Sequence, residues 1–299
     1  MATQTPLSTT AQLPTGYSLH SAASRPDMYG TLSDPNHSMS SLWPQFVTST
    51  PTSLQYWDKL SSVPYFAQYQ LIIVEKGSVT QRDAVVACAN SIPVFCTVAN
   101  LPDGGFDAML QKGMEDHFCN TGDKQRFPNL LSALGVTVSR GHRHLGLADL
   151  LIQALRELAK QSRLEALVVP LRPTRKSEHP FVDFGEYLTW KTNNDRGLDD
   201  GQIYDPWLRK HVSLGGKPLK IAPQSMTVKA SGQQWSQWMM GRDLSEVAKE
   251  QHACKKTTPT GSEYVDVPIP GALVPVRHYL AENMASYVEP NVWVVHSLC

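Results

Sequence analysis

A short basic turn near the middle of the chain has the composition of an anion-binding site. The turn covers residues 140–146 and contains two arginines, two histidines and two glycines. It follows the apolar segment 130–139 and precedes a segment of helical periodicity that begins at Leu147. The first turn of a helix leaves backbone N–H groups without partners and carries the positive end of the helix dipole, so phosphate groups bind well there. The turn is therefore the strongest candidate for ligand binding in the sequence.

Two well-known phosphate-binding turns do not fit these residues. A P-loop needs Lys and then Ser or Thr after its last glycine, whereas Leu147 and Ala148 follow Gly146. A dinucleotide-binding turn needs the spacing G-x-G-x-x-G, whereas this turn has only Gly141 and Gly146. Neither nucleotide site is expected.

Residues 143–148, RHLGLA, instead resemble the acyl-CoA-binding signature Arg/Gln-x-x-Gly-x-Gly/Ala of the GNAT acetyltransferase superfamily. The resemblance covers residues 130–171 and extends to a hairpin that begins at Tyr69 and to a helix that ends at Gly215. It implies acyl-CoA, acetyl-CoA or a longer one, as co-substrate, with its pyrophosphate on the turn and its pantetheine between two splayed parallel strands. The residues that it assigns to the acyl-CoA are Val138, Ser139, Arg143, His144, Leu145, Gly146, Leu147 and Ala148.

The sequence departs from the family where a general base is expected. In many members a glutamate on the strand before the turn takes a proton from the substrate amine, and the matching position here falls near Ser132. No carboxylate occurs over residues 129–139. The alternatives are a water chain, a substrate that needs no base, or an acid from the inserted segments, for which the candidates are Asp183, Glu186 and Asp205.

The family's second catalytic side chain is a tyrosine four residues before the glycine that ends a later helix, where it protonates the departing CoA thiolate. With Gly215 as that glycine, His211 occupies the tyrosine position. Histidine titrates near neutral pH and is able to donate this proton. Tyr204 is a second candidate, and the alternative for His211 is a histidine that only interacts with the end of the helix dipole.

The elements that position these residues form a βαβ unit with a parallel pair of strands. Strand 130–139 leads through the turn into a helix over residues 147–162, whose leucines recur in steps of three and four, and strand 165–171 follows. Pro170 suits a place where the strands have parted, since proline cannot donate to a ladder. The resemblance implies a mixed α/β fold with a GNAT-like central sheet, splayed parallel strands, helices on both faces and large insertions.

Further elements are expected on both sides of this unit. A hairpin is predicted from strands 69–74 and 84–89, with 92–98 extending the second strand. The other predicted strands are 17–22, 220–229 with a break at Pro223, 272–276 and 292–296, and the other predicted helices are 106–117, 205–214 and 233–251. Residues 1–15 are expected to be a disordered tail, and residues 16–299 one domain with insertions.

Composition narrows the classes of partner. Hydrophobic residues make up 41 % of the 299 residues and charged residues 18 %, and 27 basic residues balance 27 acidic ones. Zero formal charge argues against a nucleic-acid binder and against a protein held on a membrane by charge, and no apolar run is long enough to span one. A small-molecule substrate is expected, and the oligomeric state is left open.

The cysteine content indicates a reducing compartment. Five cysteines, an odd number, do not close into a disulfide framework, so a cytoplasmic location is expected. The pairs His117 with Cys119 and His252 with Cys254 lack the usual spacing of a zinc site, so no metal is expected. Cys88 and Cys96 lie in apolar strands and are expected to be core residues.

Two further groups of residues carry open alternatives. The basic run 172–176 either meets CoA phosphates or lies in a solvated loop. Aromatic residues in the inserted segments either line a substrate pocket or pack those segments, and they are Trp43, Phe46, Phe181, Tyr187, Trp190, Tyr204 and Trp207.

The function that follows is transfer of an acyl group from acyl-CoA to an amine or hydroxyl of a small molecule. Catalysis would rest on orientation of the two substrates and on a backbone amide near residues 138–140 that polarises the thioester carbonyl. Two alternatives stay open: a lyase or hydrolase on the same fold that acts on an acyl thioester, and a CoA-binding protein without catalysis.

Overall fold

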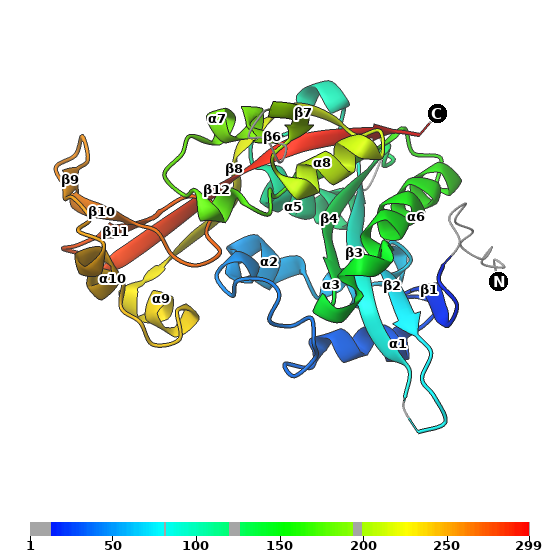
Figure 1. The fold of residues 1–299 in the computed structure, drawn as a ribbon. Coiled ribbons are helices and arrows are strands. Elements are labelled where there is room, and N and C mark those ends of the chain that lie inside the picture. The colour runs from blue at the N-terminus through cyan, green and yellow to red at the C-terminus, as the bar shows by residue number, and fades with distance from the viewer. Residues whose placement is uncertain (1–12, 81, 120–125, 194–198, 299) are drawn as a thin grey trace.

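The computed structural model describes residues 13–80, 82–119, 126–193 and 199–298. Its centre is a ten-stranded sheet in the order β1-β2-β3-β4-β5-β12-β11-β10-β9, with β8 paired to β12 (Figure 1). The strands are β1 (Tyr17–Ser21), β2 (Leu71–Glu75), β3 (Ala84–Val94), β4 (Leu130–Val138), β5 (Ala166–Leu171), β8 (Lys217–Ser231), β9 (Lys256–Thr257), β10 (Glu263–Val267), β11 (Val276–Tyr279) and β12 (Met284–Ser297), and a separate pair is β6 (Lys191–Asn193) with β7 (Asp199–Ile203).

The α-helices lie between these strands and cover both faces of the sheet (Figure 1). They are α1 (Pro26–Gly30), α2 (Pro51–Tyr56), α3 (Lys59–Ser62), α4 (Pro64–Ala67), α5 (Gly105–Phe118), α6 (Leu147–Gln161), α7 (Phe184–Thr189), α8 (Pro206–Ser213), α9 (Gly232–Trp238) and α10 (Leu244–Glu250). None of the helices in the described ranges is long and apolar enough to span a membrane.

The predicted βαβ unit is confirmed. The buried face of α6 presents Leu147, Leu151 and Leu155 to one side of the sheet, where they join a single apolar cluster with side chains of β3, β4 and β5. A second cluster, on the other face, contains side chains of α5, α9 and α10. The unit thus holds the basic turn at the end of β4, with apolar layers above and below the sheet.

The two parallel strands separate after a short paired stretch. β4 pairs with β5 only from Leu130↔Ala166 to Ser132↔Val168. Beyond that point β5 continues against β12, with Pro170 opposite Trp293, so the missing N–H of the proline faces no partner on the β4 side. A register shift against β3 at Asn90 leaves Leu134 as an extra residue in β4. The splay implied by the resemblance is therefore present, and it begins next to a bulge.

The last third of the chain differs from its prediction. β8 and β12 are long strands that run from the centre of the sheet into an arm built from α9, α10 and β9–β11 (Figure 1). β8 is continuous rather than broken at Pro223, because β8 is an edge strand and Pro223 lies where its register against β12 shifts. The predicted helix 233–251 is two helices, α9 and α10, since Gly241 has a φ of +88° and Asp243 caps a new helix.

The predicted strand 272–276 was wrong. Residues 272–275 form a connection, and the strand begins at Val276 as β11. Leu273 is buried in this connection, where its carbonyl accepts from Lys176 Nζ and its amide donates to the Tyr287 hydroxyl. Its apolar character therefore reflects burial in a loop. Of the expected tail, residues 1–12 lie outside the described residues, and Leu13 packs against the cluster around α6.

Candidate active site

The basic turn has the geometry of an anion-binding helix start. Residues 140–145 form a 3₁₀ turn, and Gly146 precedes α6 with a φ of +70°, which suits glycine. No side chain caps α6, so its first amides are available. A Cβ built on Gly141 or Gly146 meets no atom within 4 Å, and Arg143 and His144 are exposed. A phosphate group is able to approach the backbone closely here.

The turn is held from behind by Ser139. Its amide donates to Val86 O at 2.8 Å, and its carbonyl accepts from His142 N at 3.0 Å. Its hydroxyl lies 2.6 Å from Nδ1 of His142, whose Nε2 lies 3.3 Å from a carboxylate oxygen of Glu75. All polar groups of Ser139 thus have protein partners, so Ser139 fixes the turn in place.

The backbone amide of Val138 points in the opposite direction to that of Ser139. Neighbouring residues of a strand direct their backbone groups to opposite sides, and the Ser139 amide points to β3. The Val138 amide therefore points toward the gap that β5 leaves open beyond Ser132. Within the described part of the chain it is a backbone donor directed into the splay, where a donor suits polarisation of a thioester carbonyl.

A cavity of about 450 Å³ lies against this splay. Its wall includes Leu134, Gly135 and Thr137 of β4 and Pro170 of β5, so it reaches the place where the strands part. The remaining lining residues come from the segment between β1 and β2, from β3, α5, β8 and β12, and from the residue after β5. They are Tyr29, Leu32, Ser33, Met39, Ser40, Trp43, Val47, Thr48, Ser53, Leu54, Trp57, Asp58, Ser61, Cys88, Asn90, Phe106, Arg172, Met226 and Asn291. The volume is in the range of small-molecule sites.

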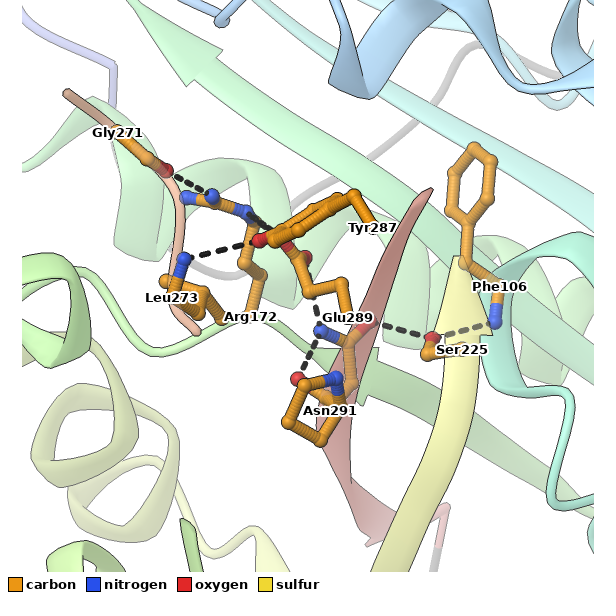
Figure 2. Close-up of polar contacts among 9 residues, drawn as sticks. Phe106, Arg172, Ser225, Gly271, Leu273, Tyr287, Glu289 and Asn291 are labelled. Atoms are coloured by element: carbon orange, nitrogen blue, oxygen red, sulfur yellow. Dashed lines mark hydrogen bonds and ion pairs between the residues drawn. The ribbon is translucent and has the colours of Figure 1, made fainter. Parts of the chain in front are cut away.

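One charged group on the cavity wall belongs to a buried network, which Figure 2 shows. Arg172 Nε lies 2.9 and 3.0 Å from the two carboxylate oxygens of Glu289, and a second nitrogen of its guanidinium donates to Gly271 O. Glu289 is fully buried and also accepts from the Tyr287 hydroxyl and from Nδ2 of Asn291. Burial, followed by the charge of Glu289, raises the pKa of Tyr287. These contacts hold the Arg172 guanidinium against the Glu289 side chain at the cavity wall.

The network continues to α5. Asn291 Oδ1 accepts from the Ser225 hydroxyl at 2.5 Å, and Ser225 Oγ accepts from Phe106 N at 2.8 Å (Figure 2). A Cβ on Gly105 would lie 2.2 Å from the same Ser225 Oγ, so only glycine allows this approach. β5, β8, β12 and α5 are thus joined at one wall of the cavity.

His211, expected as a proton donor, lies on α8 and is 1 % exposed. Its Nδ1 is 2.9 Å from Nε2 of His296 on β12, while its own Nε2 is buried and has no partner among the residues that the structure describes. Burial, with the neighbouring His296, lowers the pKa of His211 to about 3. His211 is therefore neutral near pH 7, and it is not part of the cavity wall.

Tyr204 lies just before α8, in an aromatic group with His179, Tyr187 and Trp190. Its hydroxyl is 3.3 Å from Nε2 of His179, and the guanidinium of Arg175 lies 4.5 Å from the centre of its ring. The structure does not bring Tyr204 and His211 together, because they lie at opposite ends of α8.

Ser132 is fully buried, and its hydroxyl has no partner within the described residues. It lies on β4 two residues before Leu134, which lines the cavity. Two of the acidic residues considered as a general base are engaged in capping helices. Asp205 caps α8 and also accepts from Arg175 N and the Tyr187 hydroxyl. Asp183 caps α7. None of Asp183, Glu186 and Asp205 lines the cavity.

The basic run 172–176 has partners inside the protein. Arg172 pairs with Glu289, and Arg175 pairs with Glu178 at 2.8 Å. Lys176 is buried and donates to His179 O and Leu273 O at 2.8 Å each, and burial lowers its pKa to about 8. These contacts favour a role in packing for Arg175 and Lys176.

Sequence reasoning missed the carboxylate that lines the cavity, Asp58, and the partner of Arg172, Glu289. Of the aromatic candidates, Trp43 lines the cavity and Phe46 packs in the core. Cys88 also lines it, and burial raises the pKa of its thiol to about 11. The four cysteines within the described ranges are free. The aromatic content of residues 29–61 was the available signal for this wall.

Comparison with known proteins agrees with this geometry. No family model matches the chain. It is 55 % identical over 286 residues to the arginine N-acetyltransferase avaD of Aspergillus versicolor, with 96 % of each chain covered. Among solved structures, the loading GNATL domain of CurA from Lyngbya majuscula matches with a TM-score of 0.52 at 14 % identity, over 94 % of this chain and 98 % of that one. The GphF GNAT-like decarboxylase in complex with isobutyryl-CoA matches with a TM-score of 0.47 at 15 % identity, over 94 % and 100 %. A helix start open to phosphate, a splayed pair of strands and a relative matched from end to end lead to one conclusion: the chain belongs to the GNAT acetyltransferase superfamily and is an acyl-CoA-dependent acyltransferase.

Proposed function

We propose that the protein transfers an acetyl group from acetyl-CoA to a nitrogen of arginine or of a small molecule that contains an arginine side chain. The observation that carries this proposal is the 55 % identity, over 96 % of both chains, to an arginine N-acetyltransferase. The cavity beside the splay supports it, since its volume of about 450 Å³ suits an amino acid or a modestly larger acceptor.

In this proposal acetyl-CoA binds at the turn and the acceptor binds in the cavity, and the two meet at the gap between β4 and β5. The amides around Gly146 hold the pyrophosphate, and the Val138 amide donates to the thioester carbonyl oxygen as negative charge develops there. The acceptor occupies the cavity, with its nitrogen directed at the splay beside Leu134 and Pro170. A C–N bond forms, the C–S bond breaks, the acceptor nitrogen loses a proton and the CoA thiolate gains one. Most of the acceleration comes from orientation and from the backbone donor.

The identity of the side chain that protonates the CoA thiolate stays a prediction, and the candidates are His211 and Tyr204. Among the described residues His211 Nε2 has no partner, but its lowered pKa of about 3 leaves it without a proton to donate near pH 7, whereas the Tyr204 hydroxyl carries one and lies 3.3 Å from His179 Nε2, which favours Tyr204. Loss of a general acid lowers kcat by about 10²–10⁴-fold. We expect this loss, with the KM for acetyl-CoA unchanged, in one of the variants Tyr204→Phe and His211→Gln. The cytoplasmic location also stays a prediction.

The test is an acetyl-transfer assay with defined acceptors. Purified protein is incubated with acetyl-CoA and with L-arginine, Nα-acetyl-arginine, L-lysine or L-citrulline, and thiol release and product masses are followed. We expect a product one acetyl group heavier from at least one acceptor with an arginine side chain, and its fragmentation identifies the acylated nitrogen. Binding of acetyl-CoA without transfer to either arginine compound would overturn the proposal. If CoA is released as fast without an acceptor as with one, the result would favour thioester hydrolysis.

A further inference from the structure

We propose that Asp58, with the aromatic side chains beside it, binds the guanidinium group of the acceptor and sets the preference of the enzyme for arginine. This inference rests on the proposed function, because it assumes an acceptor with an arginine side chain. It assigns a residue in the segment between β1 and β2 to the recognition of that side chain.

The first reason is the position of the Asp58 carboxylate. Asp58 lies between α2 and α3, at the N-cap position of α3, where aspartate commonly accepts a hydrogen bond from the helix. Its side chain makes no capping bond. Asp58 is one of the residues that line the cavity, its side chain lies close enough to affect Tyr29 on the same wall, and the residue is exposed. The carboxylate is thus left available for a ligand.

The second reason is the charge of the cavity wall. Among the described residues that line it, the charged side chains are Asp58 and Arg172. The charge of Arg172 is balanced by Glu289 at 2.9 Å, and the Cys88 thiol is neutral because burial raises its pKa to about 11. Asp58 therefore leaves the wall with a net negative charge. A cation in the acceptor complements it.

The third reason is the aromatic surroundings of Asp58. Trp57 precedes it and stacks on Phe106, with ring centres 6.2 Å apart and planes 28° apart. Trp43 is fixed by a 2.8 Å hydrogen bond from its indole N–H to Thr137 Oγ1. Tyr29 also lines the cavity and lies close enough to feel the charge of Asp58, which adds to burial in raising its pKa. Flat aromatic walls with one carboxylate match the planar, delocalised guanidinium better than a compact, strongly hydrated ammonium.

The experiment compares Asp58→Asn with the wild type on arginine and on citrulline, which has the shape of arginine without its charge. A hydrogen bond to a charged group contributes about 1.5–3 kcal/mol, so we expect the KM for arginine to rise about tenfold or more. The KM for acetyl-CoA and the melting temperature should not change. The preference for arginine over citrulline should fall by a similar factor.

Two further variants separate recognition from a general structural effect. Asp58→Glu keeps the charge and should retain most of the arginine preference. Glu246→Gln removes an exposed carboxylate on α10, away from the cavity wall, and should leave both acceptors unaffected.

The outcomes distinguish this inference from the proposed function. If the wild type acetylates neither arginine nor Nα-acetyl-arginine, the proposed function fails. If the wild type acetylates arginine and Asp58→Asn leaves both its KM and the arginine preference unchanged, the assignment of Asp58 is wrong and the function stands. A fall in kcat alone, with unchanged KM values and selectivity, would also contradict a role in recognition.

Discussion

The turn at residues 140–146 and the cavity beside the splay are the two halves of the site that we propose, and they are built in opposite ways. The turn comes from one continuous stretch of chain and offers mainly backbone amides, while the side chains of Arg143 and His144 are exposed. The cavity collects side chains from residues 29 to 291 and depends on contacts between distant strands. A local backbone site is tolerant of many side-chain changes, whereas an assembled site depends on each of its long-range contacts.

The network behind the cavity illustrates this dependence. Arg172 and Glu289 are 117 residues apart in sequence, and their ion pair joins β12 to the end of β5. The pair Arg175 with Glu178, only three residues apart, has side chains that are 43 % and 49 % exposed. The two pairs have similar geometry and very different burial, so they should differ strongly in their effect on stability.

The largest expected effect is on this buried pair. Glu289→Ala leaves the Arg172 charge without its partner in a buried site, which costs about 3–5 kcal/mol. The melting temperature should fall by roughly 10 °C in a thermal unfolding experiment. Glu178→Ala, the matched exposed variant, should cost less than about 1 kcal/mol. Equal losses for the two variants would show that the cavity wall does not depend on this network.

The second effect concerns the buried histidines of α8 and β12. Burial lowers the pKa of His211 to about 3, and burial followed by the charge of Arg156 lowers the pKa of His296 to about 4, from 6.5. The unfolded chain then binds more protons below pH 6.5, so stability is complete above that pH and falls as the pH drops toward 4. For His211 the loss at pH 5 is about 2 kcal/mol.

Melting temperatures between pH 7.5 and pH 4.5 measure this effect. His211→Gln should flatten the acid slope, and His252→Gln, at an exposed position, should not change it. An unchanged slope in His211→Gln would show that other groups control the loss of stability in acid. The measurement is made without ligand, so it does not depend on the turn or on the cavity.

The third effect tests the turn. Gly146→Val places a side chain where the phosphate approaches, so the Kd for CoA should rise tenfold or more, about 1.4 kcal/mol. The φ of +70° adds roughly 1–2 kcal/mol of strain to the folded protein. The measurement is the rise in melting temperature with CoA, since a ligand that binds only the folded state must raise it. Gly141→Ala, in the same turn and without a positive φ, should bind CoA nearly as well. Unchanged CoA affinity in Gly146→Val would contradict the assignment of the turn.

Local signals predicted the first half of the site and the central fold. The steps of three and four in α6, the apolar runs of β4 and β5, and the Asp205-Pro206 start of α8 all produced the expected elements, because each depends on neighbours in sequence. The arm was less well predicted. The break predicted at Pro223 was wrong because β8 is an edge strand, and the single helix predicted over 233–251 was wrong because a left-handed turn at Gly241 separates α9 from α10.

The sequence by itself determined the βαβ unit and the basic turn that we propose for acyl-CoA, because the signature, the strand and the helix are contiguous from Leu130 to Leu171. Only the tertiary structure decided which side chains line the cavity. His211 matched the tyrosine position by spacing, yet it packs on His296 and loses contact with solvent. Asp58 has no signature of its own, and it reaches the cavity only because the segment before β2 folds over the splay. Side-chain partners at such separations follow from how the strands pair and how the layers pack, and no local pattern encodes them.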